Sequence, residues 1–232
     1  MNYIVLTSGR SGSTVINNYL KQLGVGYPQA WFDGTAPLYP VDPTIDKLKA
    51  FLETKRVNGI LGLKFSWGSF FALRSKLKYK GNLKMFLDEV MPDAKFIYQK
   101  RRDRVHQAVS REKHVKVGTS HVRDEVGMHT YKTQEKQAMN GPIPVRQIKD
   151  RIWLLTKEAI AFDIFFEKHG IDPHILYFED FLKDYKAALR GILDFLSLPS
   201  EKIEVEEIYK NTHSDLNEAW HDAMLSEYKR CF

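Results

Sequence analysis

The sequence predicts an α/β fold of three layers, in which a mainly parallel sheet is covered by helices on both faces. Two observations support this prediction. Short apolar, β-rich runs alternate with longer segments that have one apolar face at helical spacing. The runs are mostly apolar, as expected for strands buried on both faces of a parallel sheet. The expected strands are Tyr3–Leu6, Ile60–Phe65, Lys95–Tyr98 and Ile175–Phe178. The length of 232 residues suits one domain over residues 1–232.

The first strand leads into a glycine-rich turn and a helix, read YIVLTSGRSGST from Tyr3 to Thr14. Gly9 and Gly12 allow the backbone to fold back tightly, and Ser13 and Thr14 suit a helix N-cap and first turn. Backbone N–H groups, the helix dipole and two hydroxyls then face one place, which favours a phosphate-like group. Ligands of open α/β sheets gather at such loops, so the first strand is expected to be central.

Arg10 adds a permanent cation with a planar donor fork to this turn. The turn is not a Walker A loop, because its second glycine follows three residues after the first and no lysine comes next. The alternative is a polar loop without a ligand, but its place between a strand and an amphipathic helix favours anion binding.

The segment from Gly24 to Pro43 contains four prolines together with aromatic and acidic residues. It is either one wall of an active site or a proline-stiffened surface connection. Thr44 is expected to cap a helix that ends before Asn58. In the next strand, Lys64 lies near the carboxyl end, where it either meets a ligand or extends to solvent.

Two further helices are expected, over residues 66–77 and 83–90, before the strand Lys95–Tyr98. This strand runs into the sequence KRRDR at residues 100–104. Four cations in five residues repel one another unless an anion lies between them. Their place at the end of a strand favours ligand binding over a solvated charge cluster.

The segment from Gly118 to Ile143 is polar and is expected to be irregular, either a substrate lid over about residues 118–143 or a mobile insertion. A long amphipathic helix should follow and end at Gly170. After the fourth strand comes the acidic pair Glu179-Asp180. The remaining predicted helices lie around residues 189–196, around Val205 and around Leu216.

Composition limits the function classes. A net charge of +6 suits anionic ligands, but the basic residues are spread along the chain and do not indicate a nucleic-acid partner. Cys231 is the only cysteine, and we find neither a signal peptide nor a membrane-spanning run, so a cytoplasmic protein without membrane insertion is expected. No HExxH or paired-cysteine spacing occurs, and no metal site is predicted.

Two features together resemble the sulfotransferases that use 3′-phosphoadenosine 5′-phosphosulfate (PAPS). One is the turn GRSGST, and the other is Arg102 followed eight residues later by Ser110 in RRDRVHQAVS. The resemblance implies a P-loop nucleotide-kinase-like fold. It also implies that the turn holds the 5′-phosphosulfate, whereas Arg102 and Ser110 hold the 3′-phosphate of PAPS and of its product PAP. The residues of the turn would be Gly9, Arg10, Ser11, Gly12, Ser13 and Thr14.

The chain is more specifically similar to the bacterial trehalose sulfotransferase family. The matching pieces run in family order over nearly the whole chain: SGRSGST, GVGYPQAWF, LGLKFSWGS, PDAKFIYQKRRDRVHQAVS, FFEKHGIDP, LYFEDF, ILDFLSLP and SDLNEAW. The family implies transfer of the sulfuryl group to a hydroxyl of a carbohydrate or another small acceptor, with no metal required. Arg10 would stabilise the charge of the transition state. A homo-oligomer is compatible with this reading.

The catalytic base departs from the family pattern. Family members carry a glutamate after the first helix, where this chain has Tyr27 and Ala30. Asp33, three residues beyond Ala30, is the substitute if Trp31 and Phe32 turn toward the cavity with it. Asp33 otherwise begins the turn Asp33-Gly34. His121 and His129 in the polar segment are the next candidates for the base.

Three other functions stay open at this point. A catalytically altered protein that binds PAPS or PAP without transfer follows from the missing glutamate. A P-loop kinase would need the absent lysine. A nucleic-acid binder is suggested by net charge alone.

Overall fold

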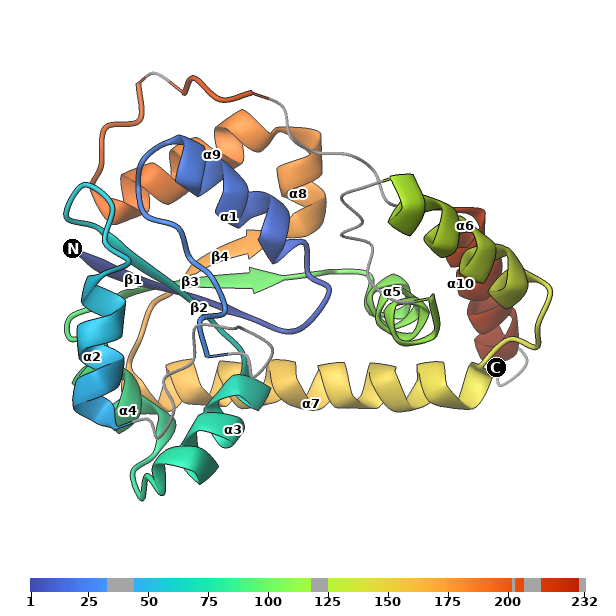
Figure 1. The fold of residues 1–232 in the computed structure, drawn as a ribbon, viewed down its shortest axis with the longest axis horizontal. Helices are drawn as coiled ribbons and strands as arrows, with labels where there is room; N and C mark the ends of the chain where they lie inside the picture. The colour runs from blue at the N-terminus through green and yellow to red at the C-terminus, as the bar shows by residue number, and fades with distance from the viewer. Residues whose placement is uncertain (33–43, 118–124, 202, 207–213, 230–232) are drawn as a thin grey trace. The chain divides into compact units, whose positions relative to one another are not determined.

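The fold is built on a sheet of four parallel strands with the order β2-β1-β3-β4 (Figure 1). The computed structural model describes residues 1–32, 44–117, 125–201, 203–206 and 214–229. The strands are β1 (Asn2–Thr7), β2 (Leu61–Phe65), β3 (Lys95–Lys100) and β4 (His174–Tyr177). Strand β1 lies between β2 and β3, so the prediction of a parallel sheet with a central first strand is confirmed.

Contacts along the chain form two compact units. The first comprises Met1–Arg102 and Ala161–Tyr209, and the second comprises Asp103–Ile160 and Lys210–Phe232. The first unit contains the sheet together with α1 (Ser13–Gln22), α2 (Ile45–Glu53), α3 (Trp67–Leu77), α4 (Leu83–Val90), α8 (Phe178–Lys183), α9 (Tyr185–Leu196) and the last residues of α7 (Val145–His169).

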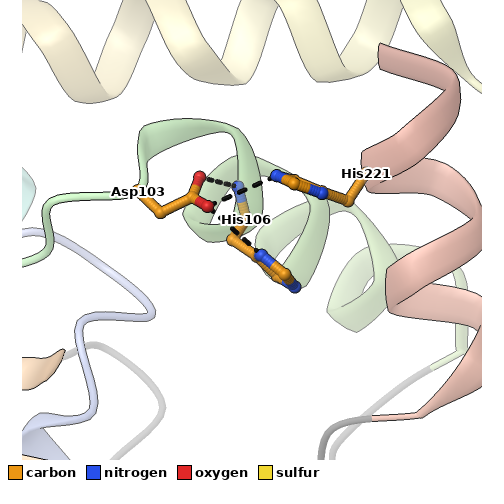
Figure 2. Close-up of side chains that lie close together, drawn as sticks. All are labelled: Asp103, His106 and His221. Carbon is orange, nitrogen blue, oxygen red and sulfur yellow. Dashed lines mark hydrogen bonds and ion pairs between the residues drawn. The ribbon is translucent and has the colours of Figure 1, made fainter. Parts of the chain in front are cut away.

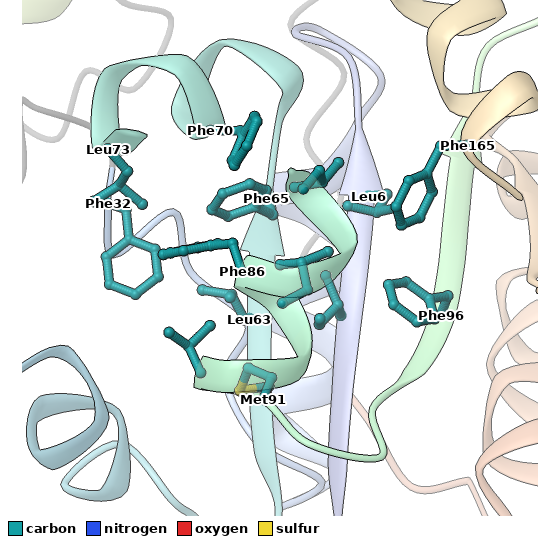
Figure 3. Close-up of a cluster of buried hydrophobic side chains, with 14 of the residues drawn as sticks. Leu6, Phe32, Leu63, Phe65, Phe70, Leu73, Phe86, Met91, Phe96 and Phe165 are labelled. Carbon is teal, nitrogen blue, oxygen red and sulfur yellow. The ribbon is translucent and has the colours of Figure 1, made fainter. Parts of the chain in front are cut away.

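The two faces of the sheet carry separate cores because successive strand residues point to opposite sides. Ile4 and Leu6 of β1 pack with α2, α3, α4 and the end of α7 in a core rich in phenylalanine (Figure 3). Tyr3 and Val5 pack on the other face with α1, α8 and α9. Burying one such side chain contributes about 1.5–3 kcal/mol. These two cores hold the sheet as the middle of three layers.

The second unit is helical and has a core of its own. It contains α5 (Arg104–Val117), α6 (Glu125–Met139), α10 (Asp215–Lys229) and the first part of α7. Trp220 of α10 is buried among apolar side chains of α5 and α7. Lys113 of α5 is also buried, and its ammonium group lies 2.6 Å from Glu135 and donates to Ser214 at 2.7 Å.

Polar caps fix the starts of several helices as their sequences suggest. The Thr44 hydroxyl accepts from the Lys47 N–H at 3.2 Å, which confirms the expected cap of α2. Ser66, Asn82 and Asp184 cap α3, α4 and α9 in the same way. Such caps satisfy N–H groups that have no partner inside the helix.

Three sequence predictions about elements are wrong. The segment expected to be irregular contains α6, a helix of 15 residues, although residues 118–124 lie outside the described part. No helix forms over residues 203–206, around Val205. Phe178, expected to end the fourth strand, instead begins the short helix α8. In each case apolar spacing was a poor guide, because these segments are short or polar.

Candidate functional site

The turn between β1 and α1 lies at the carboxyl edge of the central strand (Figure 1). Its backbone enters the left-handed region at Arg10 (φ 63°) and at Gly12 (φ 82°). Gly12 fits this region at no steric cost, whereas Arg10 is strained there. The sequence predicted that Gly9 and Gly12 allow the tight turn. Gly12 does adopt a left-handed conformation, but the second left-handed residue is Arg10 and not Gly9.

Helix α1 begins directly at this turn, and its N-cap is Gly12 rather than Ser13. Within the described chain, no side chain caps the helix by a hydrogen bond. Ser13 and Thr14 are therefore its first two residues, and their hydroxyls stand at the helix start. An N-terminus without a side-chain cap keeps donors for an anion, which the positive end of the helix dipole favours.

Three contacts brace the turn from beneath. The Gln99 amide of β3 donates to the Ser11 carbonyl at 2.6 Å, and the Thr7 and Ser11 hydroxyls are hydrogen-bonded to each other. Arg101 donates to the Arg10 carbonyl at 3.4 Å. Ser11 is fully buried, so its hydroxyl belongs to the interior of the turn. The backbone of the turn is thus held in position before any ligand arrives.

Gly12 also lies against an aromatic ring. A Cβ atom at this position would come within 2.2 Å of the Phe178 ring, which is far inside van der Waals contact. Phe178 begins α8 and is buried. Glycine is therefore needed at residue 12 both for its φ angle and for the close approach of α8.

The basic sequence after β3 is matched by carboxylates of the same unit. The Lys100 ammonium group lies 3.1 Å from Asp163 of α7, and the Arg101 Nε atom lies 3.7 Å from Glu179 of α8. Carboxylates of the protein itself therefore provide part of the negative charge that these cations require.

Arg102 is fixed by several neighbouring groups at once. Its Nη1 and Nη2 atoms each donate to one oxygen of Asp180 at 2.7 Å, and its guanidinium carbon lies 3.9 Å from the centre of the Tyr177 ring. The hydrogen bond to Asp180 raises the pKa of Arg102, and the same bond lowers the pKa of Asp180. The backbone N–H of Arg102 also faces Glu179, at 3.1 Å. The guanidinium group is about half exposed and has further donors for an anion.

A family model described as Stf0 sulphotransferase matches residues 2–227 of this chain. The chain belongs to the Stf0 sulphotransferase family. This is the bacterial trehalose sulfotransferase family, as the sequence motifs indicated. Among curated proteins, no match was found. Family membership identifies an enzyme of the sulfotransferase kind, and the parallel α/β sheet agrees with a sulfotransferase fold.

The structure adds residues to the Stf0 site that sequence reasoning had not assigned a role. Asp180 and Glu179 orient the arginines that follow β3, and Gln99 supports the turn. The sequence could have indicated Asp180 and Glu179, because acidic residues follow one predicted strand and basic residues follow another. Asn17, one helical turn after Ser13, is fully buried, and its amide has no hydrogen-bond partner among the described residues. Such a group is a candidate for contact with a ligand.

For the other predicted site residues of this Stf0 sulphotransferase, the structure gives mainly their element and burial. Ser110 lies on α5 in the second unit and is partly buried. Lys64 is partly buried on β2 beside Val5 of β1. His129 is exposed on α6. Asp33 and His121 lie outside the described residues.

The aromatic residues before Asp33 do not act as the sequence suggested. Phe32 is buried against Phe65 in the core beneath the sheet, with ring centres 6.3 Å apart. Trp31 packs edge-on against Phe51 of α2. Phe32 therefore does not meet the condition under which Asp33 would replace the glutamate, because a large apolar ring is more stable in the core.

No helix in the described part of this Stf0 chain combines the length and apolar character needed to span a bilayer.

Proposed function

We propose that this Stf0 sulphotransferase moves the sulfuryl group of PAPS to a hydroxyl of a small acceptor, most simply a carbohydrate. The observation that supports this is the uncapped N-terminus of α1, which follows a braced turn at the end of the central strand. A phosphosulfate group suits this arrangement, because backbone N–H groups and a helix dipole bind anions of that kind. PAPS supplies an activated sulfuryl group, which passes to the acceptor oxygen and leaves PAP and a sulfate ester as products.

The residues of the turn hold and stabilise negative charge in this proposal. The backbone N–H groups from Gly9 to Thr14, together with the Ser13 and Thr14 hydroxyls, contact the phosphosulfate. Arg10 faces the oxygens on which charge builds during transfer. Catalysis by such preorganised donors needs little reorganisation at the moment of reaction.

Arg102 and Ser110 are the proposed readers of the 3′-phosphate. The guanidinium group of Arg102 is oriented by Asp180 on one side and by the Tyr177 ring beneath it. An oriented guanidinium group loses less freedom when it binds a phosphate. Ser110 adds a hydroxyl donor from α5.

Asp33 is the proposed base that accepts the proton of the acceptor hydroxyl. A base at this step contributes a factor of about 10²–10⁴ in rate. Because Phe32 is buried in the core, Asp33 would act without that ring beside it. His121 and His129 are the alternatives for the base.

Two measurements test the donor and the reaction class. Calorimetry with PAP and with ATP should give binding of PAP and none of ATP, whereas a kinase would bind ATP. Labelled PAPS incubated with a panel of sugars and other hydroxyl compounds should then give a labelled sulfate ester. Binding of PAP without product from any acceptor would favour a protein that binds the nucleotide but has lost transfer.

Arg10→Ala tests the role of the turn. Loss of one preorganised charged donor should lower kcat by a factor of about 10²–10³. The measurement is the initial rate of sulfate-ester formation at saturating PAPS, with circular dichroism as the control for folding. A folded variant with near-normal turnover would contradict the assignment.

Asp33→Asn tests the base. If Asp33 is the base, its variant should keep PAP affinity and lose turnover by about a hundredfold or more. Unchanged turnover with intact PAP binding would reject Asp33 and leave His121 and His129 to be tested.

A further inference from the structure

Two histidines and one aspartate gather where α5 and α10 pack together in the second unit (Figure 2). The Nδ1 atom of His106 and the Nε2 atom of His221 each lie 3.3 Å from the same oxygen of Asp103. The two imidazole rings are stacked, with centres 4.2 Å apart. The two imidazoles are only 17% and 14% exposed, whereas the Asp103 side chain is 39% exposed.

Two of the three spacings between these ligand atoms match the coordination shell of a small ion. Around tetrahedral zinc, bonds of about 2.0–2.1 Å place neighbouring ligand atoms about 3.3–3.4 Å apart. Both Asp103-to-imidazole distances have this value, and all three ligand atoms lie within 4.8 Å of one another. Two imidazoles and a carboxylate are also a ligand set that zinc accepts readily.

Each histidine has a further carboxylate beside its other ring nitrogen. The Nε2 atom of His106 lies 3.8 Å from Glu218, and the Nδ1 atom of His221 lies 3.7 Å from Asp222. In metal sites, a carboxylate that accepts the ring N–H leaves the opposite nitrogen as the ligand. Glu218 and Asp222 lie just beyond hydrogen-bond distance of these nitrogens, and the Nδ1 atom of His106 is hydrogen-bonded to Asp103 at 3.3 Å, so a bound ion would replace that bond.

Asp103 itself is fixed at the start of α5. Its Oδ1 atom accepts from the backbone N–H of His106 at 2.7 Å, which leaves Oδ2 to face the imidazoles. Asp103 and His106 are three positions apart in the chain, so both side chains lie on one face of the first helical turn. A carboxylate held in this way needs little movement to become a ligand.

From this geometry we propose that Asp103, His106 and His221 bind one divalent transition-metal ion, with zinc as the best match. The ion joins the first turn of α5 to α10, two segments that lie far apart in the sequence. No metal site was expected from the sequence because the three ligands share no recognisable spacing motif.

Zinc calorimetry on the full chain, prepared without a histidine tag and treated with a chelator, tests this proposal. One zinc ion should bind per chain. The loss of an outer carboxylate typically weakens a metal site by about 10–100-fold, so Glu218→Gln should fall in that range. His221→Gln removes a ligand and should lose at least about a hundredfold. His129→Gln, which removes an exposed histidine of the same unit, should bind zinc as the wild type does.

Cobalt provides a second readout that does not depend on variants. Bound Co²⁺ at this site should give the visible absorption bands of four-coordinate cobalt, and zinc should displace it. Circular dichroism in the chelator shows whether each variant is folded. The proposal is overturned if the chelated wild type binds neither ion, or if folded His221→Gln binds zinc as tightly as the wild type. In either case Asp103 only joins the two histidines by hydrogen bonds.

Discussion

At the scale of single residues, Arg102 shows how the neighbours of one side chain fix its orientation. Both of its terminal nitrogens bond Asp180, and its flat face lies on Tyr177. Because the pair is about half exposed, solvent screens it, and it adds little to the stability of the fold. Its main effect is therefore to orient the guanidinium group.

Arg102→Ala should weaken PAP by about tenfold to a hundredfold, because a charged hydrogen bond to the 3′-phosphate is lost. AMP lacks that phosphate, and its affinity should hardly change. The measurement is calorimetry with both nucleotides. Lys84→Ala is the control, because it removes the same charge from a surface ion pair with Asp88. Equal weakening of PAP and AMP would show that Arg102 does not read the 3′-phosphate.

Sequence reasoning found the cations of this site but not the groups that balance them. Lys100, Arg101 and Arg102 stand together in the sequence and were visible as a cluster. Their partners come from α7 and α8, which are distant in the chain. Only the pairing of β3 with β4 brings Glu179 and Asp180 beside them. The cluster at Asp103 was missed for the same reason, since His221 comes from the last described helix.

At the scale of elements, the turn before α1 was the part of the site that could be predicted best. A strand, a glycine-rich turn and a helix follow one another locally, so no long-range contact is needed to recognise them. The bracing by Gln99 and the contact with Phe178 depend on β3 and α8 and could not be predicted. Those contacts explain why residue 12 tolerates glycine alone.

Gly12→Ala should lower the free energy of unfolding by about 3 kcal/mol, because it adds a steric clash with Phe178 to the cost of a left-handed alanine. Gly59→Ala is the matched control. Gly59 has a similar φ of 74°, but a Cβ atom there would meet nothing within 4 Å. It should cost only about 1 kcal/mol.

The difference between these two variants measures the contact of Gly12 with Phe178. It is obtained from urea unfolding curves followed by circular dichroism. Equal destabilisation would mean that the Phe178 ring moves aside without cost, and that α8 does not constrain the turn.

Helix α6 marks the limit of periodicity as a guide to elements. Its sequence, EVGMHTYKTQEKQAM, contains few apolar residues, so no apolar face stands out. The helix is nevertheless attached to its unit by polar contacts, among them the bonds of Glu135 to Lys113 and Ser214. Such contacts replace the apolar face that the prediction required.

At the scale of the whole molecule, the parallel sheet and its central first strand followed from the alternation of strands and helices. The grouping of the chain into two compact units, each with its own core, did not. Helical periodicity shows that a face is buried, but it does not show which element covers it. Helix α7 illustrates this, because its apolar positions belong to the cores of both units.

Stability should depend on pH through His174 of β4, which packs against Phe195 of α9. Burial lowers the pKa of His174 below its ordinary value of 6.5. The folded state therefore binds fewer protons than the unfolded state near that pH, and stability should fall as the pH drops through 6.5 toward the lowered value. His174→Gln should flatten this part of the curve. The check is urea unfolding between about pH 7.5 and pH 5.5, and an unchanged slope in the variant would contradict the prediction.

The carboxylates that face Lys100, Arg101 and Arg102 have a consequence for which anions can enter the site. They act as counter-ions tethered to the protein, so this edge of the sheet has little excess positive charge to offer a simple anion. To bind here, chloride or inorganic phosphate would have to displace carboxylates that are attached to the protein. The affinity of the site for such anions should therefore be low. The donor proposed above has phosphates at two places and would also contact the start of α1, so it would not depend on that exchange alone. Simple anions should therefore compete poorly with this donor.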